Sequence, residues 1–378
     1  MSALLGFSPP ARALIVAAAF VIVAAGIHAA AAIVAPFLLA VFIAIVATPL
    51  LRWLRRRGAP KWGALVVITV VLLDFGSLFA LATTGALEGF RDGLPTYQER
   101  LVVLTEQLGG WLENVGMPNS RDAVPDIFDP TQAMAVVKVL LSNAGTFFAD
   151  GLLILFTVIF ILLEAPALPA KLKAAFKTTE QADARLKKVL SSVNQYMLIK
   201  TLASLATAGI IWIWLWFLGI DFAVLWAILA FLLNFVPFVG SILMAIPAVL
   251  LALVQTDLQT TLLVAAGYLV VNTLIGSILE PKIMGKGLGI STLAVFLSLI
   301  FWGFVLGTVG VFLSVPLTMV LIIAFDASPL TRPIAILLGP EIAAPEELAP
   351  DSAAVAQPAA DEPQELLGQE REDTQQHQ

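Results

Sequence analysis

Two long apolar runs of this sequence are interrupted near their middles by residues that break a helix and offer polar groups. The first run, 222–254, contains LLNFVPFVGS at 232–241, and the second, 291–325, contains FWGFVLGTVG at 301–310. A broken helix frees backbone N–H and C=O groups and places partial charges at the ends of its two halves, so it can bind a ligand at membrane depth. Paired breaks of this kind are typical of the substrate site of a secondary transporter.

The side chains at the first break suit such a site. Asn234 adds an amide that both donates and accepts, and Ser241 adds a hydroxyl. Pro237 removes a backbone donor, and Gly240 permits close approach. The alternative is a kinked helix packed by its neighbours, since Gly and Pro are frequent in membrane helices. The second break contributes three glycines, Gly303, Gly307 and Gly310.

A few polar or ionisable residues fall within or at the ends of apolar stretches. Asp74 lies mid-span, where a carboxylate either binds a proton or cation or is protonated and bonded to a carbonyl. Glu280, at a span end, is expected to stay hydrated or to pair with Lys282, and it is the second candidate for a coupling ion. Asn272 is expected to hydrogen-bond between helices, and His28 to bond a neighbouring helix.

Composition defines the class of protein. Of 378 residues 59% are hydrophobic and only 13% are charged, whereas a soluble domain has about 25% charged residues. We therefore expect an all-α polytopic membrane protein in contact with the lipid bilayer. No cysteine, metal-binding pair, nucleophile elbow or P-loop is present. These absences predict no enzyme activity, no cofactor, no metal site and no ATP-driven transport by this chain, and nothing indicates a nucleic-acid partner.

The pattern of spans and charges divides the chain into six segments. Two spans, about 12–33 and 36–51, precede a cluster of five bases that marks the cytoplasmic side, and a third covers about 62–87. This orientation places both the N-terminus and the C-terminus in the cytoplasm. The expected segments are 1–87, N-terminal membrane spans; 88–148, an extracytoplasmic amphipathic helical segment; 149–170, a membrane span; 171–200, a cytoplasmic interfacial helix; 201–340, a transport region with broken helices; and 341–378, a disordered acidic cytoplasmic tail.

Two topologies fit the interrupted runs. If each run turns back as a re-entrant hairpin, the chain has about six full spans plus two hairpins, and the loop 280–289 lies in the cytoplasm. If each run crosses once as a tilted helix, there are eight spans and that loop lies outside. The two lysines of the loop and the mid-run Gly and Pro residues favour the hairpins. Pro247 and Pro316, 69 residues apart, suggest a loose internal repeat.

The motifs resemble those of a known family. NFVPFVGSILMAIPAVLLAL at 234–253, ILEPKIMGKGLGIS at 278–291 and LSLIFWGFVLGTVGVFLSVPLTM at 297–319 are similar to the AI-2E family of bacterial inner-membrane transporters, the PerM-like permeases. The Glu-Pro…Gly motif of that family is matched by Glu280, Pro281 and Gly285. The resemblance implies export of a small polar metabolite such as autoinducer-2, a role in quorum sensing, and a homo-oligomer, by resemblance a pentamer.

Three functions follow as competing hypotheses. The first is a secondary exporter of a small polar solute, with its site at the two breaks. The second is a Na⁺(Li⁺)/H⁺ antiporter in which Asp74 or Glu280 carries the coupling ion. The third is a non-transporting membrane scaffold that binds partners through segment 88–141 and the acidic tail.

Overall fold

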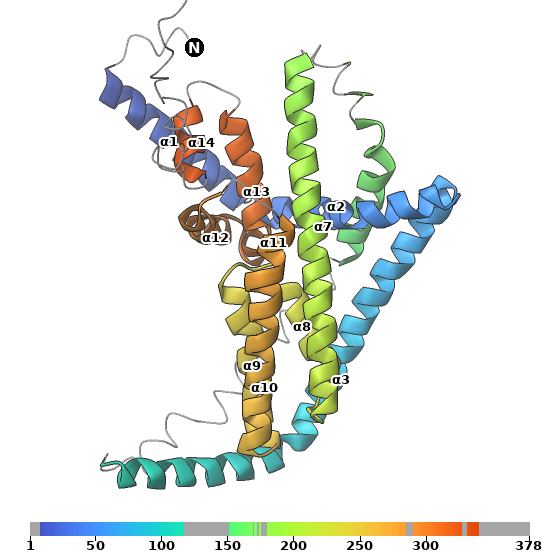
Figure 1. Cartoon of the computed structure of the whole chain (residues 1–378). Helices are drawn as coiled ribbons and strands as arrows, with labels where there is room; N and C mark the ends of the chain where they lie inside the picture. The colour runs from blue at the N-terminus through green and yellow to red at the C-terminus, as the bar shows by residue number, and fades with distance from the viewer. Residues whose placement is uncertain are drawn as a thin grey trace, which may run out of the picture. The chain divides into compact units, whose positions relative to one another are not determined.

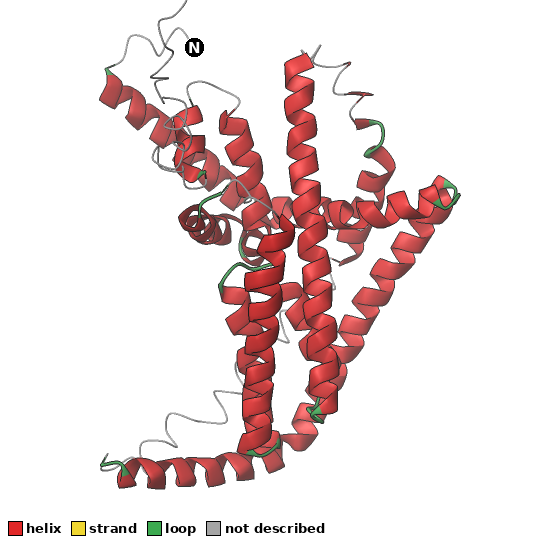
Figure 2. Cartoon of the chain, viewed as in Figure 1, coloured by secondary structure: helices red, strands yellow, loops and turns green. Residues whose placement is uncertain are grey.

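The fold is made of helices, as a computed structural model of the chain shows (Figure 2). The structure describes residues 8–116, 151–168, 170, 171, 174, 180–284, 290–326 and 331–339, and it has no strand within them. The expected acidic tail 341–378 and residues 117–148 of the extracytoplasmic segment lie outside the described residues. The all-α class predicted from composition is confirmed.

Five of the described helical stretches are long and apolar enough to cross a membrane. They are Ala31–Arg56, Lys61–Gly93, Ser191–Phe217, Leu258–Ile283 and Thr308–Asp326. The first four correspond to expected spans, and the last is the second half of an interrupted run. The expected spans 12–33 and 149–165 are represented by the shorter apolar helices Leu14–Ala29 and Gly151–Glu164. The chain is thus a polytopic membrane protein, while the count of six full spans stays a prediction.

Helix boundaries in the first half differ from the expected ones. Helix α1 (Pro9–Ala29) ends near Ala30, and α2 (Ala31–Arg56) runs on through Pro36, where a break was expected. A proline costs a helix one hydrogen bond, and a long apolar helix tolerates that loss. Helix α3 (Lys61–Asn114) joins the third span to the amphipathic stretch around Tyr97 without interruption.

The expected boundary between a cytoplasmic helix at 171–200 and the transport region that begins at 201 does not coincide with a helix end, and the part of this helix that lies in the membrane stays a prediction. Helix α7 (Glu180–Phe217) covers both as one helix. The charged residues before 190 had suggested a surface element, but the helical pattern of apolar residues continues through them. As a consequence Lys200, which had been grouped with the cytoplasmic bases, is buried within a stretch that can span the membrane.

The first interrupted run is a helical hairpin. Helix α8 (Ala223–Leu233) and helix α9 (Val239–Gln255) pack against each other. The two ends of the run meet at its base. There the side chain of Gln255 accepts a hydrogen bond from the Asp221 N–H at 3.0 Å and donates one to the Gly219 carbonyl at 3.1 Å. A run whose ends are hydrogen-bonded has turned back on itself, so the hairpin prediction is confirmed for 222–254.

The second interrupted run has the same design. Helix α12 (Thr292–Leu306) and helix α13 (Thr308–Asp326) pack closely along their lengths and meet at Gly307. The second arms of the two hairpins begin at Val239 and Thr308, which are 69 residues apart, like Pro247 and Pro316 within them. The matched positions extend the internal similarity from two prolines to the helix starts.

The remaining helices hold the hairpins in place (Figure 1). Helix α10 (Leu258–Val271), the π-helical segment η2 (Asn272–Leu279) and α11 (Glu280–Met284) form one continuous helical stretch beside α9 and α7. The apolar core between these helices contains Ile211, Leu215, Ala230, Met244, Ala248 and Val264. Helix α14 (Arg332–Leu338) follows α13, and its last residue accepts a hydrogen bond from the Ser291 N–H at 2.9 Å.

Candidate functional site

The tip of the first hairpin, residues 234–238, is a tight and strained turn. Phe238 has φ 59° and ψ −52°, and the Val239 N–H donates to the Pro237 carbonyl at 2.6 Å. This is a γ-turn of the hand that strains any residue with a side chain. The Ser241 hydroxyl donates to the Phe238 carbonyl at 3.1 Å, which closes the turn from the α9 side. Strain of this kind tends to gather at functional sites.

Gly240 lets the two arms of this hairpin touch through their backbones. A Cβ at this position would lie 1.9 Å from the Leu233 carbonyl oxygen, so no other residue fits without moving α8 away from α9. Gly240 thus permits a close approach of backbone, and its expected role at a substrate site stays a prediction. Its partner in the approach is the hairpin's own first arm.

Asn234, the first residue of the tip, ties the hairpin to α7. Its side-chain Nδ2 donates to the Ser204 Oγ at 2.9 Å, and both residues are buried. Ring contacts on either side fix the tip further: Phe235 packs edge-on against Phe42 of α2, and Phe231 packs edge-on against Phe75 of α3. The tip is thus held by one buried hydrogen bond and by aromatic packing.

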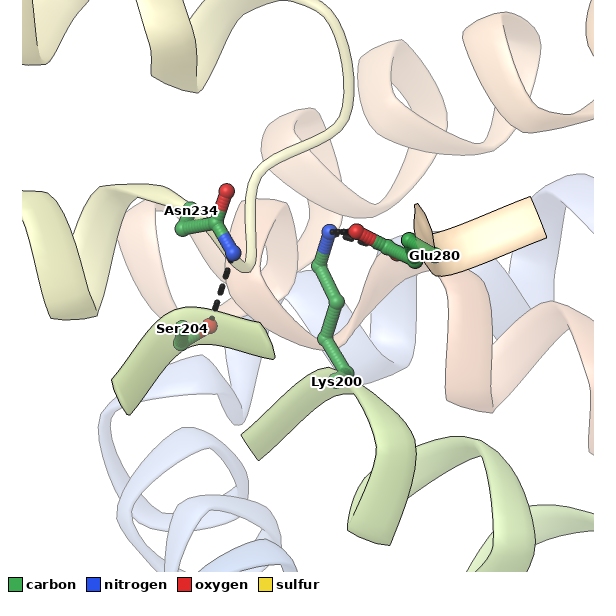
Figure 3. Close-up of polar contacts among 4 residues, drawn as sticks. All are labelled: Lys200, Ser204, Asn234 and Glu280. Carbon is green, nitrogen blue, oxygen red and sulfur yellow. Dashed lines mark hydrogen bonds and ion pairs between the residues drawn. The ribbon is translucent and has the colours of Figure 1, made fainter. Parts of the chain in front are cut away.

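Glu280 forms a buried ion pair with Lys200, one turn before Ser204 on α7 (Figure 3). The Lys200 Nζ lies 2.8 Å from Oε1 and 2.9 Å from Oε2 of Glu280, and the two side chains are only 10% and 12% exposed. The sequence-based expectation of hydration or a pair with Lys282 was wrong, because α7 passes close to α11 and offers a lysine at that level. We call Lys200, Ser204, Asn234 and Glu280 the polar cluster.

The segment that leads to Glu280 is itself irregular. Residues Asn272–Leu279 form a π-helix between α10 and α11, a rare conformation that is frequent at functional sites. Asn272 begins it, with its Oδ1 beside Gly276, where an added Cβ would lie 3.2 Å away. Its expected role in bonding between helices stays a prediction. Pro281 is exposed next to Glu280, and Gly285 lies outside the described residues.

The second hairpin has a simpler tip. Gly307 alone makes the turn, with φ 66°, which glycine adopts without strain. A Cβ at Gly310 would lie 1.8 Å from the Trp302 carbonyl oxygen, and a Cβ at Gly303 would lie 3.0 Å from Val311. The Trp302 Nε1 donates to the Thr318 Oγ1 at 3.0 Å between the two arms. All three glycines predicted for this break are therefore in or beside the turn.

His28 contacts the second hairpin close to its tip. Its Nδ1 lies 3.2 Å from the Val305 carbonyl and its ring stacks on Phe304. A carbonyl only accepts, so Nδ1 carries the proton in this bond. The expectation that this histidine bonds a neighbouring helix is confirmed.

Asp74 is not part of the polar cluster. It lies on an exposed face of α3 in the single chain, so the expected buried carboxylate is Glu280 instead. Lys200 and Ser204 were missed as site residues. The signal that could have found Lys200 is an isolated base within an apolar helical stretch of 27 residues, a pattern that marks functional positions in membrane proteins.

Comparison with known proteins decides the family. Residues 16–329 match the sequence profile of the AI-2E family transporter. The chain belongs to the AI-2E family. It is 39% identical over 84% of its length to the AI-2 transport protein TqsA of Escherichia coli (strain K12), covering 92% of that protein. It is 40% identical over 87% of its length to a putative transport protein of Haemophilus influenzae, covering 96% of it. It is 38% identical over 85% of its length to the putative transport protein YhhT of Escherichia coli (strain K12), covering 93% of it.

Membership of the AI-2E family makes this chain a multi-pass membrane transport protein and not an enzyme. It also removes the scaffold hypothesis, because the relatives carry transport names over nearly their whole length. The polar cluster and both hairpins fall inside the part of the chain that matches the family. They are therefore features of the AI-2E region of the chain and not of the tail that follows it.

Proposed function

We propose that this chain is a secondary exporter of a small polar metabolite and that the solute passes the tip of the first hairpin at the polar cluster. One observation carries the proposal: two buried polar contacts, Asn234–Ser204 and Glu280–Lys200, meet α7 one turn apart. One contact comes from a hairpin tip and the other from the end of a π-helix. Broken helices that bring polar groups to membrane depth are the arrangement expected of a transport site.

The other predicted residues have roles around this cluster. Pro237, Gly240 and Ser241 shape the first tip, Asn272 and Pro281 flank the π-helix and α11, and Gly285 follows in the loop. Gly303, Gly307 and Gly310 shape the second hairpin, which forms the other wall of the route. Autoinducer-2 is the first substrate to test, since the relative TqsA is named an AI-2 transport protein.

The test is efflux from proteoliposomes that are loaded with autoinducer-2. Asn234→Ala and Glu280→Gln are each expected to slow efflux about tenfold, the effect of raising a barrier by about 1.4 kcal/mol. Asp74→Asn is the matched control, because it removes an acid from the exposed face of α3 and should leave efflux unchanged. Efflux that survives both cluster substitutions but falls in the Asp74 variant would place the route elsewhere.

A Na⁺(Li⁺)/H⁺ antiporter is the second candidate, and the buried Glu280 carboxylate is the observation that favours it. In that case Na⁺ added to proteoliposomes produces a proton signal, and Glu280→Gln removes it. A proton signal without autoinducer-2 flux would replace the first proposal by this one.

The orientation in the bacterial inner membrane is proposed from charge, with both termini in the cytoplasm. The chain has no cysteine, so single cysteines at positions 282 and 286 can be labelled from either side. Labelling by an impermeant external reagent would contradict the hairpin topology, because the loop 280–289 lies outside only if each interrupted run crosses the membrane once. The homo-oligomer implied by the family resemblance is tested by measuring the mass of the purified protein in detergent.

A further inference from the structure

The ammonium of Lys200 lies where a monovalent cation would bind the Glu280 carboxylate. Its nitrogen is almost equidistant from the two carboxylate oxygens, at 2.8 and 2.9 Å. A cation held by both oxygens of one carboxylate takes the same symmetric position. The lysine reaches this position from α7, so the occupant is covalently attached to the protein (Figure 3).

Two features of Glu280 suit a cation site, namely the irregular backbone before it and its low exposure. The carboxylate follows directly after eight residues of π-helix, and irregular backbone at membrane depth supplies the carbonyl oxygens that coordinate Na⁺ in transporters. The two side chains are only 10% and 12% exposed, so each charge is largely removed from water and is stabilised mainly by the other. Without Lys200, Glu280 would be a buried carboxylate beside irregular backbone, and such a group attracts a hard cation.

We propose that Lys200 is a tethered cation that occupies a Na⁺ or Li⁺ site at Glu280, so that the wild-type chain binds neither ion there. This inference deepens the proposed function and rests on its assignment of the polar cluster to the transport site. A free ion would have to compete with a group held beside the carboxylate at high effective concentration. It would also leave a buried ammonium without a partner, which is strongly unfavourable. Export through this site is therefore independent of Na⁺, and any pairing of transport with a cation has to use another group.

The inference predicts a gain of function on removing the lysine. In Lys200→Met the carboxylate loses its tethered partner and the space of the ammonium is opened to an ion. Na⁺ and Li⁺ should then bind, and choline should not. Lys200→Arg keeps the charge and should not bind Na⁺. Lys282→Ala is the matched control, since Lys282 lies two residues from Glu280 but is exposed.

The experiment is thermal unfolding of the purified full chain in detergent, in NaCl, LiCl or choline chloride at equal ionic strength. Lys200→Met should show a saturable rise in Tm of roughly 3 °C in NaCl over choline chloride, as expected for a ligand that binds only the folded state. Wild type, Lys200→Arg and Lys282→Ala should show no difference between the salts. The double variant Lys200→Met/Glu280→Gln should lose the response.

Two results would overturn the inference. A Na⁺-specific shift in wild type shows that the ammonium does not exclude the ion, which is the behaviour an antiporter needs. If the Lys200→Met variant folds but its Tm is the same in NaCl and choline chloride, the Glu280 carboxylate does not bind a cation when the ammonium is removed. If Lys200→Met does not fold, Lys200→Gln takes its place and the wild-type measurement still decides. Because the readout is binding and not flux, a failed efflux assay refutes the proposed function without touching this result.

Discussion

The two hairpins share one backbone device but differ in how their tips are made and held. In both, a glycine near the start of the second arm touches a carbonyl of the first arm, Gly240 with Leu233 and Gly310 with Trp302. The first hairpin then turns through a strained phenylalanine and is tied to α7 by a buried amide. The second turns through an unstrained glycine, and its arms are joined by the hydrogen bond from Trp302 to Thr318 and contacted near the tip by His28.

This difference indicates that the two hairpins have different roles. A tip that stores strain and depends on a polar contact with another helix has an alternative arrangement within reach, because the same bond can be exchanged for one to a solute. A tip that turns at a glycine and bonds between its own arms gains little from moving. We infer that the first hairpin carries the functional polar groups and that the second provides a stable wall.

The largest expected effect tests what the hairpins share. Gly240→Ala and Gly310→Ala should each destabilise the protein by about 4 kcal/mol or more, because each Cβ collides with a backbone carbonyl that cannot rotate away. Thermal unfolding in detergent measures the loss. Gly209→Ala on α7 is the control, since a Cβ there meets nothing within 4 Å. Should either hairpin variant melt like the control, the arms do not touch at that glycine.

The next effect compares the ion pair of the polar cluster with the neutral hydrogen bond between the arms of the second hairpin. Lys200→Ala leaves the Glu280 carboxylate buried without a partner and should cost about 3–5 kcal/mol. Trp302→Phe removes only a neutral hydrogen bond to Thr318 and should cost about 1 kcal/mol. The same melting experiment compares them. In the double variant Lys200→Met/Glu280→Leu most of the lost stability should be recovered, because no charge is left buried. If it is not recovered, the loss in Lys200→Ala comes from packing and not from the unpaired charge.

A smaller effect, of opposite sign in the two hairpins, tests the turns. Phe238→Gly should stabilise the first tip by about 1 kcal/mol, since glycine adopts φ 59° without a steric cost. Gly307→Ala should destabilise the second tip by about 1–2 kcal/mol, because φ 66° is unfavourable for alanine although the space around it is open. If both substitutions change the melting temperature in the same direction, the two turns do not differ in backbone strain.

The smallest effect concerns the bases of the hairpins and appears at alkaline pH. The Tyr97 hydroxyl donates to an Asp221 oxygen at the base of the first hairpin, and burial and that carboxylate raise the pKa of Tyr97 above 10.0. The folded chain thus keeps this proton to higher pH than the unfolded chain. Stability should therefore fall as the pH rises above about 10, and Tyr97→Phe should flatten that fall.

The base of the second hairpin supplies the comparison. Ser291 caps α12 by accepting a hydrogen bond from the Ala294 N–H, and Ser291→Ala should cost about 1 kcal/mol. No ionisable group takes part in that bond, so the loss should be the same at neutral and alkaline pH. Equal pH profiles for wild type and Tyr97→Phe would show that Tyr97 does not sense Asp221.

Much of the fold followed from local pattern. The length and interruption of each apolar run, with the two lysines of the loop 280–289, favoured a hairpin over a single tilted crossing. The glycines of both breaks were found because close approach and positive φ restrict the residue type itself. Helix ends did not coincide with the expected segment boundaries where an apolar pattern continued across a change in charge, as in α3 and α7, since helix formation depends on neighbouring residues and not on segment composition.

Less of the candidate site than of the fold could be predicted from the sequence. Asn234 and Glu280 were identified as unusual residues, and Gly240 as a place of close contact. Their partners were not, because Ser204 lies 30 residues from Asn234 and Lys200 lies 80 residues from Glu280. Asp74 was as conspicuous in the sequence as Glu280, yet it faces outward from α3. Nothing local to either acid distinguishes the two environments.

The sequence by itself determined the membrane class, the positions of the two breaks and the residues able to form a turn there, because hydrophobic length, glycine and proline act through the chain's own backbone. Only the tertiary structure decided that Asn234 and Glu280 both contact one turn of α7. On that turn Ser204 accepts a hydrogen bond from Asn234, and Lys200 forms an ion pair with Glu280. Pairing of this kind depends on which helix faces meet in space, and that arrangement is set by the packing of all the helices together.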